Sequence, residues 1–222
     1  MYRVAFLLFT VFNIVGFLHV IDLPLSDKLG FLRVMNLPLG DKVISERQIE
    51  AASHSRYMVQ NEIQGVFATQ YSKDTSYSYA SLEDFAESHL QEGYPIFLLA
   101  DISTCAINLM NNSKGSFTIS VANCSVDNYS GMPYDPLACY RITLLGEFVQ
   151  QIEPVNMLDP NLLSFIKKHP AAHDWINHSG HIFHLWEFKF SEIHYIGGYG
   201  NIHYIGPIDL DLYFSSEPIK PL

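Results

Sequence analysis

The stretch that most resembles a ligand-binding motif is SEIHYIGGYGNIHYIGPIDL at residues 191–210. It places Gly197, Gly198 and Gly200 directly after a strand-like run. A dinucleotide loop needs the pattern G-x-G-x-x-G at the start of a helix, because helix N–H groups then face the pyrophosphate. Here the glycines follow the order G-G-Y-G, and the strand-like run NIHYI comes next. We therefore predict a glycine bend or bulge between barrel strands, and no phosphate loop.

Histidine is the second residue type that could do chemistry, and it is abundant late in the chain, at His169, His173, His178, His181, His184, His194 and His203. Metal sites need ligands that converge on one point, and neither H-E-x-x-H nor a Cys–His pairing is present. There is also no G-x-S-x-G motif and no recognisable catalytic spacing of carboxylates. We predict no metal ligands and no catalytic residues, with surface or half-buried histidines that could respond to acidic pH.

Four N-x-S triplets are candidate N-glycosylation sites, at Asn111, Asn123, Asn128 and Asn177. Each triplet is a weak signal alone, because such triplets also arise by chance. They occur together with a signal-like N-terminus, MYRVAFLLFTVFNIVGFLHV, in which Arg3 precedes an apolar run. That run is shorter than the roughly 20 apolar residues of a membrane span. We predict a secretory signal peptide at 1–20, with an uncleaved membrane anchor as the alternative.

Residues 21–44 are predicted to be a linker that contains most of a tandem duplication. FLHVIDLPLSDK at 17–28 returns as FLRVMNLPLGDK at 31–42, and eight of the twelve positions are identical. Two copies are too few for a solenoid, which needs at least three repeats to bury a stacked core. The folded domain is therefore expected to span 45–222.

The three cysteines are consistent with one disulfide and one free thiol. Cys124 and Cys139 bracket a polar loop between two strand-like runs. Closing a loop of about 15 residues would contribute about 3 kcal/mol in the chain-entropy model. Cys105 lies in an apolar helix-like segment and is expected to be buried. The alternative is that all three are reduced.

Around these residues the sequence predicts an α+β fold dominated by antiparallel strands in a closed or half-closed sheet. A helix should begin at Ser45, which forms a capping-box spacing with Gln48, and should end at Gly65. A second capped helix is expected after Asp159. The remaining ranges come from apolar patterns: strands at 65–71, 78–87, 95–101, 115–123, 139–152, 181–190 and 192–205, and a helix at 103–112.

The composition excludes one class of partner. The chain has 222 residues, a formal charge of −10 and only 13 scattered Lys and Arg residues. Because nucleic-acid binding requires clustered positive charge, no nucleic-acid partner is expected.

Several segments together resemble the CREG family, over roughly 45–205. They are ASHSRYMVQNEIQGVFAT, PIFLLADISTCAINLMNNSKGSFTISVA, DPLACYRITLLGEF, FIKKHP and HLWEFKFSEIHYIGGYG. This family is similar to pyridoxamine 5'-phosphate oxidase-like, FMN-binding split barrels, and the tail also resembles HugZ-like haem-utilisation proteins. The resemblance implies a split β-barrel with flanking helices, a homodimer, and any cofactor pocket at the dimer interface. It also strengthens the Cys124–Cys139 disulfide.

The resemblance can be weighed against the residues present. An FMN phosphate needs Arg or Lys partners on the early strands, and between Tyr57 and Tyr140 only Lys73 and Lys114 occur. No histidine follows His203, although the HugZ-like branch uses one in a C-terminal extension. We therefore expect a secreted or lysosome- or vacuole-lumenal glycoprotein that binds a receptor or other partner without catalysis and without a cofactor. The alternative is an FMN- or haem-dependent oxidoreductase.

Overall fold

The computed structural model describes residues 44–121, 139–178, 180–200 and 203–221. The predicted signal peptide and linker lie outside these residues, as do Cys124, Asn123 and Asn128. Residues 44–222 form one compact unit. Among the described helices, none has the length and apolar character needed to cross a membrane.

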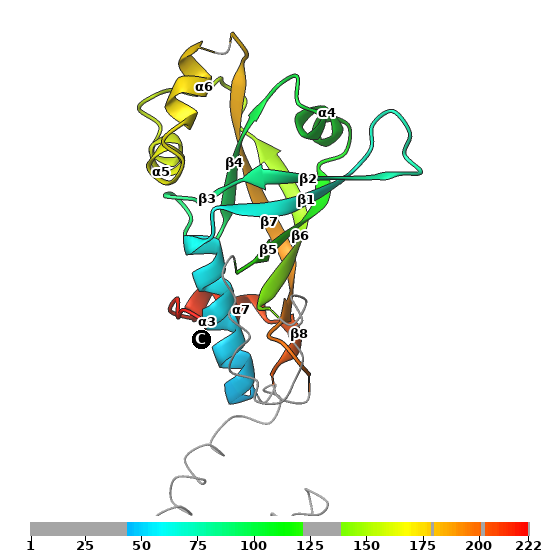
Figure 1. The fold of residues 1–222 in the computed structure, drawn as a ribbon, viewed down its shortest axis with the longest axis vertical. Coiled ribbons are helices and arrows are strands. Elements are labelled where there is room, and N and C mark those ends of the chain that lie inside the picture. The colour runs from blue at the N-terminus through cyan, green and yellow to red at the C-terminus, as the bar shows by residue number, and fades with distance from the viewer. Residues whose placement is uncertain (1–43, 122–138, 179, 201–202, 222) are drawn as a thin grey trace, which may run out of the picture. The chain divides into compact units, whose positions relative to one another are not determined.

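The fold is a curled antiparallel sheet with helices at its two ends (Figure 1). In chain order the elements are α3 (Glu46–Asn61), β1 (Gln64–Gln70), β2 (Ser78–Asp84), β3 (Ala86–Glu87), β4 (Pro95–Ala100), α4 (Thr104–Asn111), β5 (Lys114–Ser120), β6 (Arg141–Gln150), α5 (Pro160–Lys168), α6 (Ala172–His178), β7 (Phe183–Ile196), β8 (Ile205–Ile208) and α7 (Leu210–Ser215). This order confirms the α+β prediction.

The strands follow the order β2-β1-β5-β6-β7-β4-β3, and β8 pairs with β7. Every pairing is antiparallel. The sheet curls because strands twist, and β2 comes into contact with β4 across the ends of the sheet. The result is a half-closed split barrel, as predicted.

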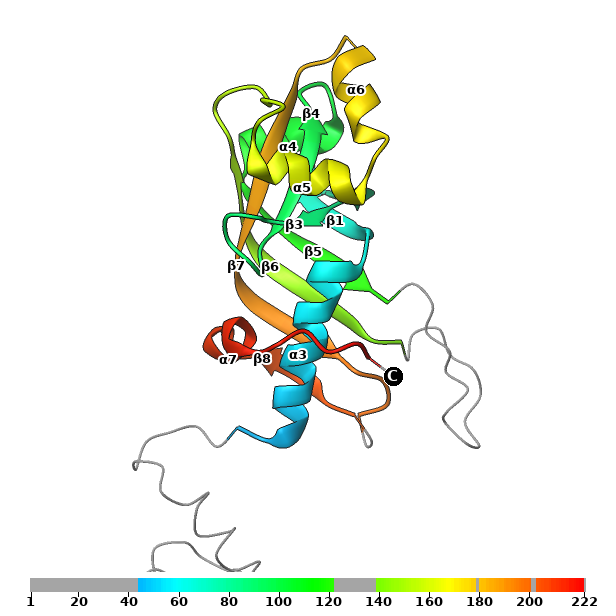
Figure 2. The ribbon, with the colours of Figure 1, turned by 90° about the vertical axis from the view of Figure 1, so that its left-hand side faces the viewer.

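The core lies inside the curl. Phe67, Phe97, Phe117 and Phe148 stack there at ring distances of 4.1–6.1 Å. Apolar residues of α3 and α4 join the same cluster. A second cluster lies between β4 and the α5–α6 pair, around Phe165. Figures 1 and 2 show α5 and α6 at one end of the sheet, and α3, α7 and β8 at the opposite end.

Helix α3 begins as the sequence predicts. The Ser45 hydroxyl accepts from Gln48 N, and the Gln48 side chain accepts from Ser45 N at 3.0 Å. This satisfies two N–H groups that the first turn leaves without partners. The predicted end at Gly65 is wrong, since the helix ends at Asn61 and Gly65 belongs to β1. A Cβ at Gly65 would lie 2.5 Å from the Phe117 ring, so close strand packing explains this glycine.

The other predicted helices are confirmed. Asp159 accepts from Asn161 N and Leu162 N at the start of α5, and Ser103 caps α4. Helices α6 and α7 were not predicted. Each is seven residues or fewer, and so short a segment carries little apolar periodicity.

The glycine-rich stretch lies at a chain reversal. β7 ends at Ile196, and β8 pairs back on it from Ile205. Gly198 has a φ of +122°, which favours glycine. The predicted bend is thus confirmed, and the next helix, α7, begins only after β8. The register shift of the β6–β7 pair lies elsewhere, opposite Leu145 and Gly146.

Candidate functional site

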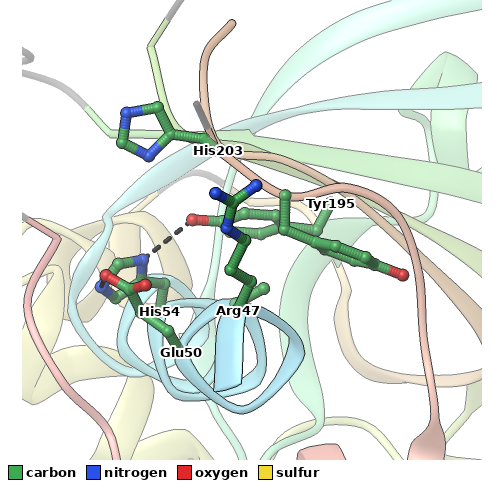
Figure 3. Close-up of a pocket in the computed structure, with 7 residues that line it drawn as sticks. Arg47, Glu50, His54, Tyr195 and His203 are labelled. Atoms are coloured by element: carbon green, nitrogen blue, oxygen red, sulfur yellow. Dashed lines mark hydrogen bonds and ion pairs between the residues drawn. The ribbon is translucent and has the colours of Figure 1, made fainter. Parts of the chain in front are cut away.

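A small pocket lies between α3 and the β7–β8 end of the sheet. Its volume is about 150 Å³. Charged, imidazole and phenol groups and one methyl group line it: Arg47, Glu50, Ala51, His54, Tyr195, His203 and Tyr204. Figure 3 shows the side chains of Arg47, Glu50 and His54 rising from one side of α3 toward Tyr195 and His203.

Helix geometry explains why three of these residues meet. Arg47, Glu50 and His54 are spaced by three and four positions, so they lie on one face of α3. The long strand β7 supplies Tyr195 near its C-terminal end, and the chain reversal after it supplies His203. The pocket therefore depends on residues about 150 positions apart in the sequence.

The floor of the pocket is a buried hydrogen-bonded pair. Nδ1 of His54 lies 2.8 Å from the Tyr195 hydroxyl, and both residues are buried. Nε2 of His54 lies 3.9 Å from a Glu50 carboxylate oxygen, which is an ion-pair distance rather than a hydrogen bond. Tyr140 packs edge-on against the His54 ring at 5.3 Å.

The rim is polar and partly exposed. Glu50 is 61% exposed at its side chain, and Arg47 is also exposed. His203 packs against Tyr140 at a ring distance of 6.0 Å, and Tyr204 donates to Pro207 O at 2.7 Å. A pocket with a fixed floor and charged rim can hold a small polar ligand.

Burial controls the protonation of both histidines. It lowers the pKa of His54 below its usual value; Glu50 opposes this shift and His203 adds to it. Burial also lowers the pKa of His203, with Glu50 again opposing and Arg47 adding. Both imidazoles are therefore neutral at neutral pH.

A second, largely buried polar cluster lies on α3, outside the pocket described above. Arg56 forms an ion pair with Glu87 at 2.8 Å, and Gly93 N donates to the same carboxylate at 2.7 Å. The Tyr213 hydroxyl donates to Gly93 O at 2.8 Å, and the Arg56 guanidinium lies 5.3 Å from the Tyr213 ring centre. Burial raises the pKa of Tyr213 well above its usual value. This cluster ties α7 to α3 and β3.

The outer face of the sheet is a third notable surface. We define it by two rows of paired residues from β2, β1, β5 and β6: Leu82, Val66, Thr118 and Thr143, then Ala80, Ala68, Ser116 and Leu145. None of these eight side chains is charged. Leu82, Val66 and Leu145 are 62%, 45% and 36% exposed, so no described element covers them.

The predicted modification sites are only partly described. Asn111 ends α4 and Asn177 lies in α6; both are exposed, and each side-chain amide donates to a carbonyl of its own helix. Cys139 is buried just before β6. Because its predicted disulfide partner and the other two sequons lie outside the described residues, glycosylation and the disulfide stay predictions.

Cys105 is a buried free cysteine on α4, as predicted. Its thiol donates to Glu83 at 3.1 Å and lies 2.9 Å from the Ser81 hydroxyl. Burial raises the pKa of Cys105 to about 12. The thiolate that nucleophilic chemistry requires is therefore absent at physiological pH.

Among the described residues, the other histidines do not gather into a site. His169 and His184 are more buried than predicted, and each donates a ring N–H to a backbone carbonyl, of Phe85 and Gln151. The described residues hold no cluster of His, Cys, Asp and Glu that could bind a metal ion.

The residues present do not fit an FMN phosphate on the early strands. Lys73 is exposed in the turn after β1, and Lys114 is 75% exposed and pairs loosely with Glu147 at 3.9 Å. Neither forms the buried cationic cradle that a phosphate dianion needs. The α3 pocket is also small beside the roughly 300–1,000 Å³ of cofactor-sized sites.

Comparison with known protein families identifies the class to which this chain belongs. The sequence model of the CREG β-barrel family matches residues 46–215. The chain therefore belongs to the CREG family, and its fold is the split barrel. A comparison with curated protein sequences gives no significant match.

Solved structures agree on the fold. A heme-binding protein from Mycobacterium smegmatis is 21% identical over 80% of this chain, with a TM-score of 0.59. A protein of unknown function from Agrobacterium tumefaciens is 18% identical over 71% of this chain, with a TM-score of 0.51. The matches span only 63% and 62% of those two chains.

Most of the pocket was not predicted from the sequence. His203 was among the histidines expected to be exposed or half-buried, whereas His54 and Tyr195 were not candidates. The only local signal was the spacing of Arg47, Glu50 and His54 on a predicted helix, a pattern that many solvated helix faces share.

Proposed function

We propose that this protein is a secreted or lumenal glycoprotein that binds a partner as a homodimer and performs no catalysis of its own. Membership of the CREG family is one support. The inert thiol of Cys105 and the missing phosphate cradle are the others. A receptor glycoprotein is the kind of partner expected.

The observation that carries the homodimer is the uncharged eight-residue patch on the outer face of the sheet, which is bordered by Glu192 beside Leu145 and by the Lys114–Glu147 pair. The chain has a net charge of −10, so two copies repel each other wherever their charged surfaces meet. A two-fold dimer brings the same patch of each copy together, so a patch without charge avoids that repulsion. Exposed Leu82, Val66 and Leu145 supply apolar area for such an interface.

Oligomeric state tests this interface directly. We expect sedimentation equilibrium of the purified protein to give a dimer at about 10–50 µM, a concentration range that suits interfaces of standard size. Leu82→Lys and Val66→Lys should give monomers, because each buries a charge in the interface. Leu163→Lys is the matched control, since Leu163 is 50% exposed on α5 away from this face. A monomeric wild-type protein would overturn the homodimer.

A second candidate function is a flavin- or haem-dependent oxidoreductase. It is favoured by the fold relative described as a heme-binding protein. A visible absorption spectrum of protein purified from a eukaryotic secretory host separates the two candidates. A stoichiometric flavin or haem band would contradict the non-catalytic proposal, and a colourless protein that stays colourless after incubation with FMN and haemin would support it.

Secretion and glycosylation have their own test. We propose cleavage of the signal peptide at 1–20 and glycan attachment at one or more of Asn111, Asn123, Asn128 and Asn177. Mass spectrometry before and after enzymatic deglycosylation identifies the occupied sites. N-terminal sequencing of the mature protein decides cleavage, and a mature chain that starts at or before Tyr2 would show that the segment is retained.

A further inference from the structure

We propose that the pocket lined by Arg47, Glu50, His54 and His203 binds a small oxyanion, and that it binds this anion more tightly in acid than at neutral pH. The ligand class is a sulfate, a phosphate or the same group carried as an ester. This site is separate from the outer face of the sheet, so it stands independently of the homodimer.

The donors of the pocket are suited to an oxyanion. Arg47 makes no ion pair with a described residue, and its guanidinium projects into the pocket opposite His203 (Figure 3). A guanidinium donates in a planar fork that matches two oxygens of one anion. His54 has Nδ1 engaged by Tyr195, which leaves Nε2 on the Glu50 side of the ring.

The floor and one wall of the pocket, His54, Tyr195 and Tyr204, are held in place before any ligand arrives. Tyr195 is held in β7 and orients the His54 ring through the 2.8 Å contact. Tyr204 is fixed by its hydrogen bond to Pro207 O, and its hydroxyl also accepts from the Gln48 side chain at 3.4 Å. Pre-organised donors lose less conformational entropy when a ligand binds. A volume of about 150 Å³ suits an anion of a few atoms.

Protonation changes the charge of the pocket strongly. At neutral pH the charges of Arg47 and Glu50 cancel, since both imidazoles are neutral. In acid, His54 and His203 each gain a proton, and the net charge of the four side chains rises by two. The neighbouring side chains packed against His54 are the phenols of Tyr140, just before β6, and of Tyr195 on β7. The pocket therefore changes from neutral to cationic.

Glu50 has a specific part in this behaviour. At neutral pH its carboxylate repels an anion at the rim. When His54 is protonated, Glu50 lies 3.9 Å from Nε2 and pairs with it, which reduces that repulsion. Glu50 should thus weaken anion binding most when both histidines are neutral. A site for a zwitterion would depend on Glu50 in the opposite way, because Glu50 would hold the ammonium group.

The test is a titration of the full chain with sodium sulfate, followed by NMR of the histidine side chains. Sulfate keeps a double charge across this range, so only the protein titrates. We expect the affinity for sulfate at about pH 5 to exceed that at about pH 7.5 by at least tenfold, because one hydrogen bond to a charged group contributes about that factor. By linkage, sulfate must also raise the pKa of His54 and His203. Methyl sulfate, titrated in parallel, distinguishes an esterified anion from a free one.

Variants separate this site from non-specific attraction. Arg47→Gln should weaken sulfate binding about tenfold at both pH values, and His203→Gln should reduce the acid enhancement. Glu50→Gln should strengthen binding at neutral pH. His54→Gln should behave like His203→Gln. If the variant at the buried His54 fails to fold, the variant at the half-buried His203 still provides the test. His194→Gln, an exposed histidine outside the pocket, is the control.

The proposal is overturned by any of three results. The first is the absence of sulfate and methyl sulfate binding at about pH 5. The second is equal affinity at the two pH values, since the charge argument would then be wrong. The third is a weakened neutral-pH affinity for sulfate in Glu50→Gln, because removal of a carboxylate at the rim should strengthen the binding of an anion.

Discussion

Helix α3 contributes to two buried polar clusters that differ in one respect: one is closed and the other is open. Arg56 enters the closed cluster, where Glu87, Gly93 and Tyr213 supply partners for its charge and for one another. His54, two residues earlier, faces the open pocket, where Tyr195 engages only one of its ring nitrogens. The clusters share a helix but have different neighbours.

The difference shows where binding capacity can lie in this fold. In the closed cluster one Glu87 carboxylate oxygen accepts from both Arg56 and Gly93, while the buried Arg56 Nε has no hydrogen-bond partner. Such a network stabilises the fold but leaves no room for a ligand. In the open cluster the nearest charged neighbour of His54 Nε2 is Glu50 at 3.9 Å, too far for a hydrogen bond. A bound ligand can therefore provide a hydrogen-bond partner within reach of His54 Nε2.

The largest expected effect comes from breaking the closed cluster with Arg56→Met. Removal of the guanidinium leaves the Glu87 carboxylate, whose side chain is 15% exposed, without its ion-pair partner, and breaking a buried pair costs up to about 3–5 kcal/mol. Urea unfolding followed by circular dichroism measures this loss in the free energy of unfolding. Arg47→Met, on the exposed rim of the same helix, is the control and should change stability by less than about 0.5 kcal/mol. Equal losses in the two variants would refute the distinction.

The next largest effect is expected for Tyr213→Phe. The variant keeps the buried ring but removes the donor to Gly93 O, so a buried carbonyl loses its partner. The expected loss is about 1–3 kcal/mol in the free energy of unfolding. Tyr77→Phe, at an exposed tyrosine, should leave stability unchanged. A neutral Tyr213→Phe would mean that water replaces the hydroxyl and that the cluster is less closed than the geometry indicates.

The sequence could predict local features of this fold because they depend on residues close in the chain. The Ser45–Gln48 capping box and the Asp159 cap need only neighbours within three positions. Most strands were recognised from apolar runs of strand length, such as 95–101. The predicted strand at 192–205 is wrong in its second half, because β7 ends at Ile196 and the chain reverses before β8. The family resemblance supplied the split-barrel topology, which periodicity alone does not specify.

Both polar clusters escaped prediction because they are long-range. The His54–Tyr195 contact joins residues 141 positions apart, and Tyr213 reaches Gly93 across 120 positions. Nothing in a single sequence specifies such pairs, since residue type alone does not distinguish a buried histidine from a solvated one. The β6–β7 register shift has the same origin: Gly146 is glycine because a Cβ there would collide with Lys189 O on the neighbouring strand.

A smaller effect is expected for Ser45→Ala, which tests whether the two clusters respond independently. Loss of the N-cap should cost about 1 kcal/mol, because the first turn of α3 loses a side-chain acceptor. That turn carries Arg47 and Glu50, whereas Arg56 lies two turns further on. Hydrogen exchange should therefore speed up at the amides around the pocket and stay unchanged around Arg56. Uniform acceleration along α3 would show that the helix opens as one unit.

The smallest effect is the pH dependence that His54 gives to stability. Its pKa is lower in the folded chain than in the unfolded chain, since burial disfavours the charged ring. On acidification the unfolded chain takes up the proton first, so the free energy of unfolding should fall as the pH drops from about 7.5 to about 5. His54→Gln should show a shallower fall than wild type, while His194→Gln should match wild type. Because other histidines titrate in the same range, the difference between the variant and wild-type slopes is the quantity to measure. Parallel slopes for His54→Gln and wild type would mean that the ring remains solvated, and the open cluster would then lack the buried floor that distinguishes it from the surface.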